Sequence, residues 1–299
     1  MEVSKALALE LGALPQPVVT GYQLGFHLFK LYQTKTHRGE TLTKLKKQLP
    51  ERSDFKRVIN QLVSNGVLQP CRDFSGHVFS LLGKEPNAPE VACSVDPFAY
   101  LSHLSAMEYH GLTQRLPKLL FLSSPFPEEW RRSALERMKK DLSEELLERY
   151  ARTGLPALTQ VRFTKIGRHT VQVFASSHLG AFLTVRDRTL RIATLGRTFL
   201  DMLRQPDLCG SIYHVLEVFE AHAVHYLPLI LDELDQHGSK IDKVRAGYVL
   251  EERCGLRNQR IERWQAAVQR GGSRKLYAQG GYSSRFSERW SLSLNVEAR

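Results

Sequence analysis

The sequence is poor in cysteine, and the positions of its four cysteines exclude two common stabilising devices. Cys71, Cys93, Cys209 and Cys254 lie far apart, and no two of them form a C-x-x-C pair. Disulfide frameworks and structural zinc sites need cysteines at closer, regular spacing. We therefore expect reduced thiols and no metal site, as in a cytoplasmic protein.

Long apolar runs are also missing. No run reaches the roughly 18 residues of a membrane helix, and Glu2 and Glu10 flank the short apolar run 6–9, which argues against a signal peptide. Apolar residues make up 42% and charged residues 24% of the chain, close to ordinary globular composition. With 299 residues, the chain exceeds the usual size of one domain, so we expect a soluble cytoplasmic protein of two domains.

The usual catalytic motifs are absent from the sequence. It contains no G-x-S-x-G nucleophile turn, no G-x-x-x-x-G-K-[ST] phosphate loop and no H-E-x-x-H metal helix. His222 and His225 have a spacing that can present two metal ligands on one helix face. Because no third ligand follows, we interpret them as polar positions on a partly buried helix. We predict no catalytic activity and no cofactor.

Positive charge is in excess, and it is concentrated in two stretches. Lysine and arginine total 42 against 31 aspartate and glutamate, a net charge of +11. Residues 30–72 hold 10 basic and 3 acidic side chains and residues 239–290 hold 12 and 5, whereas the remainder is slightly acidic. Such clustering is typical of surfaces that bind phosphates or acidic proteins.

The first basic stretch falls within a predicted series of three helices and a hairpin. Periodicity predicts helices over 20–35, 41–49 and 53–65. Leucines at 42, 45 and 49 define the second helix, and Ser53 and Asn65-Gly66 are the expected start and stop of the third. Residues 67–69 and 77–82 predict a hairpin around the loop 70–76. This order is that of a winged helix-turn-helix, which we expect to occupy residues 1–83.

The third predicted helix has two chemically different faces. Phe55, Val58, Ile59, Leu62 and Val63 share one apolar arc, and the side chains opposite are Ser53, Arg57, Asn60, Gln61 and Ser64. Arginine, asparagine and glutamine can hydrogen-bond base edges in the major groove, while lysines hold phosphates. The predicted DNA-binding residues are Lys44, Lys46, Lys47, Ser53, Lys56, Arg57, Asn60, Gln61, Arg72 and His77. The alternative is a small helical domain whose polar helix face only meets water.

The rest of the chain predicts a linker and a larger domain. Residues 84–92 contain Pro86, Asn87 and Pro89 and are typical of an extended linker. Residues 93–299 are expected to form a mixed α/β domain, which places the whole chain in the α+β class. The expected helices are 96–110, 127–152, 197–203, 210–222, 226–237, 240–254 and 258–269, and the expected strands lie in 118–122, 160–175 and 183–194.

The second basic stretch combines an arginine-rich helix with a flexible loop. Gly271-Gly272-Ser273 lies among cations and can cradle a phosphate or contact RNA or acidic protein groups. The other interpretations are a nucleotide site or a solvated turn. The candidate surface residues are Arg257, Arg260, Arg270, Arg274 and Lys275.

Four strings resemble a known family. They are DPFAYLSHLSAMEYHGL at 96–112, GRTFLDMLRQPDLCGS at 196–211, and the pair RGGS at 270–273 and YSSRFSERW at 282–290. In these strings the chain resembles the AbiEi antitoxins of the AbiE abortive-infection systems. The resemblance implies a bacterial regulator whose winged helix represses its own operon at inverted repeats in double-stranded DNA.

The same resemblance implies a second task for residues 93–299. The C-terminal domain of such antitoxins counteracts a nucleotidyltransferase toxin, AbiEii, with or without direct contact, and the second basic stretch is the expected antitoxin surface. Two alternatives remain. One is a nuclease that a winged helix delivers to nucleic acid, and the other is a ligand-sensing repressor without a toxin.

Overall fold

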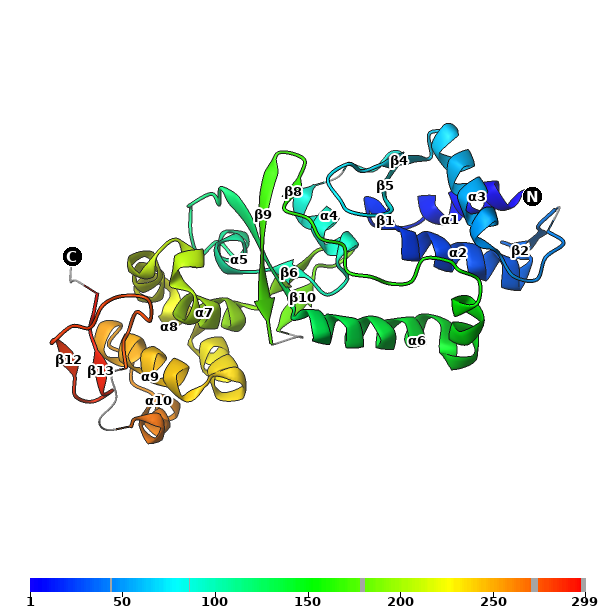
Figure 1. The fold of residues 1–299 in the computed structure, drawn as a ribbon. Coiled ribbons are helices and arrows are strands. Elements are labelled where there is room, and N and C mark those ends of the chain that lie inside the picture. Colours follow the sequence, from blue (N-terminus) through cyan, green and yellow to red (C-terminus); the bar gives the residue numbers. More distant parts are fainter. Residues whose placement is uncertain (44, 86, 178–180, 270–273, 297–299) are drawn as a thin grey trace. The chain divides into compact units, whose positions relative to one another are not determined.

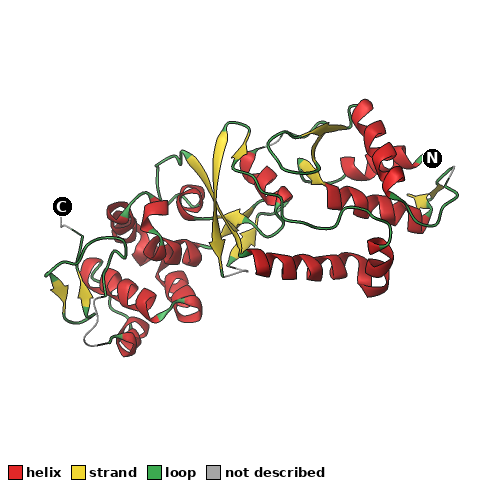
Figure 2. Cartoon of the chain, in the orientation of Figure 1, coloured by secondary structure: helices red, strands yellow, loops and turns green. Residues whose placement is uncertain are grey.

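The fold is mixed α+β and divides into two compact units (Figures 1 and 2). A computed structural model describes residues 1–43, 45–85, 87–177, 181–269 and 274–296. Unit 1 comprises Met1–Tyr100, Ser123–Leu179 and Thr184–Arg191, and unit 2 comprises Leu101–Leu122, Gly180–Leu183 and Ile192–Arg299. This division does not coincide with the break expected at 84–92. In the described part of the chain, no helix has both the length and the apolar character needed to cross a membrane.

Unit 1 begins with three helices and a small antiparallel sheet. The strands of this sheet follow the order β1-β5-β4, with Val19 opposite Phe79 and Gln69 opposite Ser80. The elements are α1 (Val3–Gly12), β1 (Val18–Thr20), α2 (Gly21–Thr34), β2 (Thr36–His37), β3 (Glu40–Thr41), α3 (Arg52–Ser64), β4 (Leu68–Pro70) and β5 (Val78–Leu81). The predicted helices at 20–35 and 53–65 and the predicted hairpin are confirmed, whereas α1 is additional.

Local hydrogen bonds explain where α2 and α3 begin. Thr20 and Gln23 form a reciprocal capping box at the start of α2, in which the Thr20 hydroxyl accepts from the Gln23 backbone. Helix α3 does not use Ser53 as its cap, contrary to the prediction. It begins one residue earlier, and the Asp54 carboxylate accepts a 3.2 Å hydrogen bond from the Glu51 backbone N–H.

The helix predicted over 41–49 is wrong for the residues that the structure describes there. The backbone N–H of Leu42 donates to Lys35, and that of Thr43 donates to Met1, so these donors bond to distant residues rather than to a helical turn. Leu42 is buried and Leu45 and Leu49 pack partly into the unit 1 core. The leucine spacing therefore reflects burial of an irregular segment.

Six later strands form a sheet in the order β10-β11-β6-β7-β9-β8. Its strands are β6 (Tyr100–Leu101), β7 (Leu119–Pro125), β8 (Lys165–Ile166), β9 (His169–Ser176), β10 (Phe182–Thr184) and β11 (Arg191–Ala193). The remaining helices are α4 (Ala88–Val95), α5 (His103–Tyr109), α6 (Pro127–Ala151), α7 (Leu195–Arg204), α8 (Ile212–His237), α9 (Lys240–Tyr248) and α10 (Gln259–Arg263), and β12 (Phe286–Ser287) pairs with β13 (Leu292–Ser293).

Two predictions near the expected linker are wrong. Residues 88–92 belong to α4, whose start is capped by the Asn87 side chain accepting from the Glu90 backbone at 2.9 Å. Pro89 lies in the first turn, where a missing N–H is tolerated. The helix predicted over 96–110 is limited to α5, because the buried Asp96 carboxylate accepts from Ser124 and Trp130 and the chain then enters β6.

The other predicted elements are largely confirmed, with changed ends. The strand at 118–122, the helix at 127–152, the strands around Gly167 and the helix at 197–203 are present. The helices predicted at 210–222 and 226–237 form the single helix α8, which contains Pro228. The segment 183–194 forms two strands. Helix α9 continues in π geometry over Val249–Arg253, and α10 is followed by a 3₁₀ turn over Trp264–Ala267.

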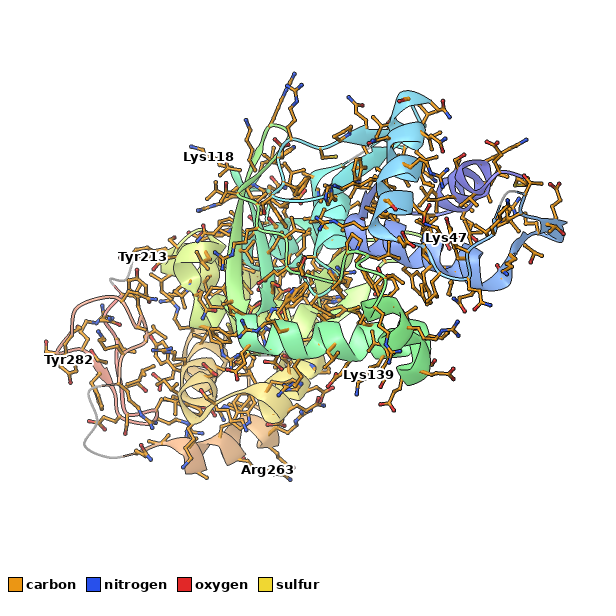
Figure 3. All side chains as sticks on the ribbon, turned by 45° about the vertical axis from the view of Figure 1, so that its right-hand side comes forward. Lys47, Lys118, Lys139, Tyr213, Arg263 and Tyr282 are labelled. Carbon is orange, nitrogen blue, oxygen red and sulfur yellow. The ribbon has the colours of Figure 1, made fainter. Side chains whose placement is uncertain are left out.

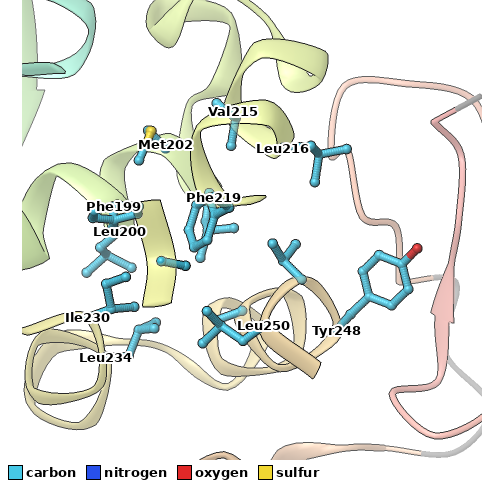
Figure 4. Close-up of a cluster of buried hydrophobic side chains, with 14 of the residues drawn as sticks. Phe199, Leu200, Met202, Val215, Leu216, Phe219, Ile230, Leu234, Tyr248 and Leu250 are labelled. Atoms are coloured by element: carbon cyan, nitrogen blue, oxygen red, sulfur yellow. The ribbon is translucent and has the colours of Figure 1, made fainter. Parts of the chain in front are cut away.

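Each unit has its own apolar core. In unit 1, Leu24, Leu28 and Phe29 of α2 pack with α1, α3 and the buried Tyr150 of α6. The core of unit 2 is formed mainly by α7, α8 and α9 around Phe199 and Phe219 (Figure 4). The separate cores allow the surface of each unit to be considered by itself.

Candidate nucleic-acid interface

The two faces predicted for α3 are present in the structure. Phe55, Val58, Ile59 and Leu62 are buried in the unit 1 core. The exposed residues, which we call the polar face of α3, are Ser53, Arg57, Asn60, Gln61 and Ser64. Arg52 and Lys56 of α3 are exposed as well. The helix therefore presents several hydrogen-bonding side chains to solvent while its other side anchors it.

A buried aspartate restrains two of the predicted DNA-binding cations. Asp54 accepts from Lys47 at 3.0 Å and from Arg57 at 3.2 Å, and Lys47 also pairs with Glu51 at 3.1 Å. Lys47 is labelled in Figure 3. Burial raises the pKa of Asp54, but these hydrogen bonds and that from the Glu51 backbone outweigh burial and lower it below its ordinary value. The Arg57 side chain is still 60% exposed. Lys46 is exposed, and Lys44 lies outside the described residues.

The loop between β4 and β5, residues 71–77, lies beside α3. Arg72 and His77 are exposed on it, and the His77 ring is stacked with Phe79, with 6.3 Å between ring centroids. A groove of about 440 Å³ lies between α3 and this hairpin. Lys56, Asn60 and His77 line the groove together with apolar side chains such as Ile59 and Phe79. The structure thus brings predicted residues from the helix and the loop to one concave surface.

A segment that sequence reasoning overlooked packs against both elements. Gly154 and Pro156 complete the groove beside α3, and Tyr150 donates to the Pro156 carbonyl at 2.7 Å. A Cβ on Gly25 would lie 2.5 Å from the Tyr150 hydroxyl, so α2 needs glycine at this position for the close approach. A sequence signal existed, because residues 152–186 include five arginines and lysines but no aspartate or glutamate.

The second basic cluster differs, because most of its described cations already have partners. Arg260 pairs with Asp232 and Asp235 of α8, each at 2.7 Å. Arg274 donates to the Ala267 carbonyl and to Gln269, and Lys275 donates to the Gly280 carbonyl at 2.6 Å. These three side chains therefore hold the fold of unit 2 together.

The last two residues of the predicted antitoxin surface have different positions. Arg257 is exposed at a polar pocket of about 420 Å³, which it lines with Glu251, Glu252, Glu262 and Arg289. Arg270 and the loop 271–273 lie outside the described residues. The structure therefore gives the cluster a mixed charge rather than a uniformly positive one.

The histidines that resemble metal ligands are not joined by further ligands. Among the residues that the structure describes, no group of three or more histidine, cysteine, aspartate or glutamate side chains is arranged to hold a metal ion. His222 is partly exposed and His225 is exposed on α8, and the His225 ring packs edge-on against Tyr226. Their contacts fit a helix surface.

Buried contacts account for several residues in the strings that resemble AbiEi antitoxins. Arg197 and Asp201 form a 2.7 Å ion pair whose side chains are 3% and 2% exposed. A Cβ on Gly196 would lie 2.4 Å from the Leu229 carbonyl, so α7 packs closely on α8. These residues stabilise unit 2.

Known proteins provide no independent assignment. No protein-family model and no curated protein matches this chain.

Proposed function

We propose that the chain is a regulator that binds double-stranded DNA through a winged helix in unit 1 and acts as an antitoxin through unit 2. The observation that carries the DNA-binding proposal is the exposed polar face of α3, with Arg57, Asn60 and Gln61, beside the exposed Arg72 and His77 of the loop 71–77. The element order α1-β1-α2-β2-β3-α3-β4-β5 and the sheet order β1-β5-β4 also favour it, because a recognition helix followed by a hairpin is the arrangement of winged helices.

Side-chain chemistry indicates which residues would contact bases and which would contact phosphates. Asn60 and Gln61 carry amides that can pair bidentately with adenine, and Arg57 can pair with guanine. Lys46, Lys56 and Arg72 supply charge for phosphates, which sets position rather than sequence. Asp54 holds Lys47 and Arg57 near the start of α3, so both cations share its carboxylate when they contact DNA.

The antitoxin half of the proposal rests on the resemblance to AbiEi antitoxins. Such a protein represses its own operon and counteracts a nucleotidyltransferase toxin. Among the predicted surface residues, Arg257 is exposed, whereas Arg260, Arg274 and Lys275 bond within unit 2. We therefore assign Arg257 to toxin neutralisation and the other three to maintaining the surface that carries it.

The DNA-binding proposal can be tested without knowing the operator. Duplexes that the full chain selects from a random pool are used to measure affinity by fluorescence anisotropy. Asn60→Ala and Gln61→Ala should each weaken binding to the selected duplex by about 1 to 3 kcal/mol. Gln279→Ala, at an exposed position in unit 2, is the matched control. Wild-type affinity in both α3 variants would contradict the proposal, and metal-dependent cleavage of the duplex would favour a nuclease instead.

The antitoxin proposal is tested by co-expression. Growth arrest by an AbiEii-type nucleotidyltransferase should be relieved by the full chain and relieved less by Arg257→Ala, while repression by that variant is retained. Equal relief by the variant would remove Arg257 from the antitoxin surface. No relief by the wild-type chain would contradict the antitoxin assignment itself.

A further inference from the structure

Residues 162–169, which we call the basic turn, contain Arg162, Lys165, Arg168 and His169 and no aspartate or glutamate. Arg162 precedes β8, Lys165 lies in β8, and Arg168 and His169 follow Gly167 at the tight turn into β9, where Gly167 has φ +57°. All four basic side chains are exposed. In the described part of the chain, Arg162, Lys165 and Arg168 form no ion pair.

This lack of ion pairs separates the basic turn from the other cationic surfaces. Lys47 and Arg57 share Asp54, and Arg260 bonds two aspartates. A cation that is already paired must give up or share its carboxylate to bind another anion, whereas an unpaired exposed cation attracts a phosphate at no such cost. The basic turn is therefore well suited to contact a polyanion.

Contacts hold the basic turn beside the β4–β5 loop. The Gly167 backbone N–H donates to Asp73 at 2.7 Å, and the Ser75 hydroxyl donates to the Arg162 carbonyl at 3.2 Å. Phe74 and Phe163 pack edge to face with centroids 5.4 Å apart. The loop and the turn are thus joined by two hydrogen bonds and an aromatic contact.

The two hairpins also line a common groove of about 700 Å³. Arg72 contributes to it from the β4–β5 loop, and Arg168 and His169 contribute from the basic turn. Pro70 lines both this groove and the groove beside α3. Asp73 also lines the larger groove, so exposed cations on α3, the loop and the basic turn follow one another across unit 1 with this carboxylate among them.

We propose that the basic turn is a second phosphate-binding hairpin, which extends the DNA interface of unit 1 along the duplex beyond the β4–β5 loop. This inference rests on the proposed DNA binding. A duplex is favoured as the partner because its regular array of phosphates can meet the exposed cations of α3, the β4–β5 loop and the basic turn together. We assign the cations of the turn to phosphate contacts, which set position on the duplex rather than sequence.

The test uses the full chain and a fluorescent mixed-sequence duplex over a series of salt concentrations. The triple variant Arg162→Ala, Lys165→Ala, Arg168→Ala should bind more weakly. The slope of log affinity against log salt is negative, and its magnitude should fall by about 2 to 3, since each phosphate contact contributes about 0.9. The matched control is Arg131→Ala, Arg132→Ala, Lys140→Ala on α6, which removes the same charge from exposed positions along the edge of unit 1 away from the β4–β5 loop (Figure 1). Circular dichroism melting checks that both triple variants fold, and Arg162→Gln, Lys165→Gln, Arg168→Gln repeats the test with longer side chains.

The outcomes separate this inference from the proposed function. If both variants of the turn keep the wild-type slope while Asn60→Ala still weakens binding to a selected duplex, the basic turn does not contact DNA although α3 does. If the α6 control variant reduces the magnitude of the salt slope as much as the variant of the turn does, total charge explains the effect and the inference is wrong. If the wild-type chain binds no duplex, both proposals are wrong.

Discussion

The Asp73 carboxylate accepts a 2.7 Å hydrogen bond from the backbone N–H of Gly167, a residue 94 positions later in the chain. The bond joins the turns of two hairpins, β4–β5 and β8–β9, and the rings of Phe74 and Phe163 pack beside it. A loop that is exposed on a small sheet would ordinarily open readily. This relationship therefore indicates that the β4–β5 loop is stabilised by a segment outside the first 83 residues.

Removing the aromatic part of this contact should loosen the loop without changing charge. We expect Phe163→Ala to increase amide hydrogen exchange in residues 71–77, because the loop loses an apolar contact, while protection of α3 is retained. Phe286→Ala, which truncates a 42% exposed ring in unit 2, is the control. Unchanged exchange in the loop would show that the contact with Phe163 does not hold it.

The carboxylate of Asp54 should make stability depend on pH. Its pKa is lowered in the folded state because hydrogen bonds from Lys47, the Glu51 backbone and Arg57 outweigh the effect of burial. A lowered pKa stabilises the fold at pH values above the unfolded value of about 3.9, and this contribution is lost as the pH falls through the folded value.

Asp54→Asn should therefore lower the free energy of unfolding by about 1 to 3 kcal/mol at neutral pH, the usual range for hydrogen bonds to charged groups. The deficit relative to wild type should shrink in strongly acidic buffer. Chemical denaturation at both pH values measures the difference, and Asp187→Asn, whose side chain is 91% exposed, should have little effect. A deficit that stays constant with pH would indicate that the charge of Asp54 is unimportant.

Replacing only one member of the buried ion pair Arg197–Asp201 should strongly destabilise the fold. Asp201→Ala leaves a guanidinium in a buried site, and we expect a loss of about 3 to 5 kcal/mol in unfolding free energy. Arg197→Met with Asp201→Leu should cost less than Asp201→Ala, since no unpaired charge remains. Glu148→Ala removes the exposed pair with Arg152, at 3.9 Å, and should change stability by less than about 1 kcal/mol. Similar losses of unfolding free energy in Asp201→Ala and Glu148→Ala would indicate that the pair Arg197–Asp201 is exposed to solvent.

The close packing of Gly247 against Trp290 in unit 2 predicts that a larger residue at position 247 will clash. A Cβ on Gly247 would lie 2.1 Å from the ring of Trp290, which is fully buried. We expect Gly247→Ala to destabilise the protein by about 1 to 3 kcal/mol or more through overpacking. Gly12→Ala, where no atom lies within 4 Å of the added Cβ, should be neutral or stabilising by up to about 1 kcal/mol. Equal melting temperatures for the two variants would contradict the packing of Trp290 on α9.

Local sequence signals predicted those elements whose stability is itself local. The apolar arc of α3, the stop at Asn65-Gly66 and the turn at Gly167 are each encoded within a few residues, and all are present. The same reasoning was wrong at 41–49, where leucines at helical spacing reach the core from an irregular backbone. It was also wrong at 88–92, because Asn87 and Pro89 are as suitable for a helix start as for a linker.

The sequence by itself determined where the charge lies and which side of α3 faces solvent, because charge and helical period are properties of a short stretch. Only the tertiary structure decided which cations are available. Arg260 is paired with aspartates from another helix, whereas Arg162, Lys165 and Arg168 form no ion pair with the described residues. Ion pairing depends on groups that folding brings together from distant positions, and the spacing of residues along a chain does not contain that information.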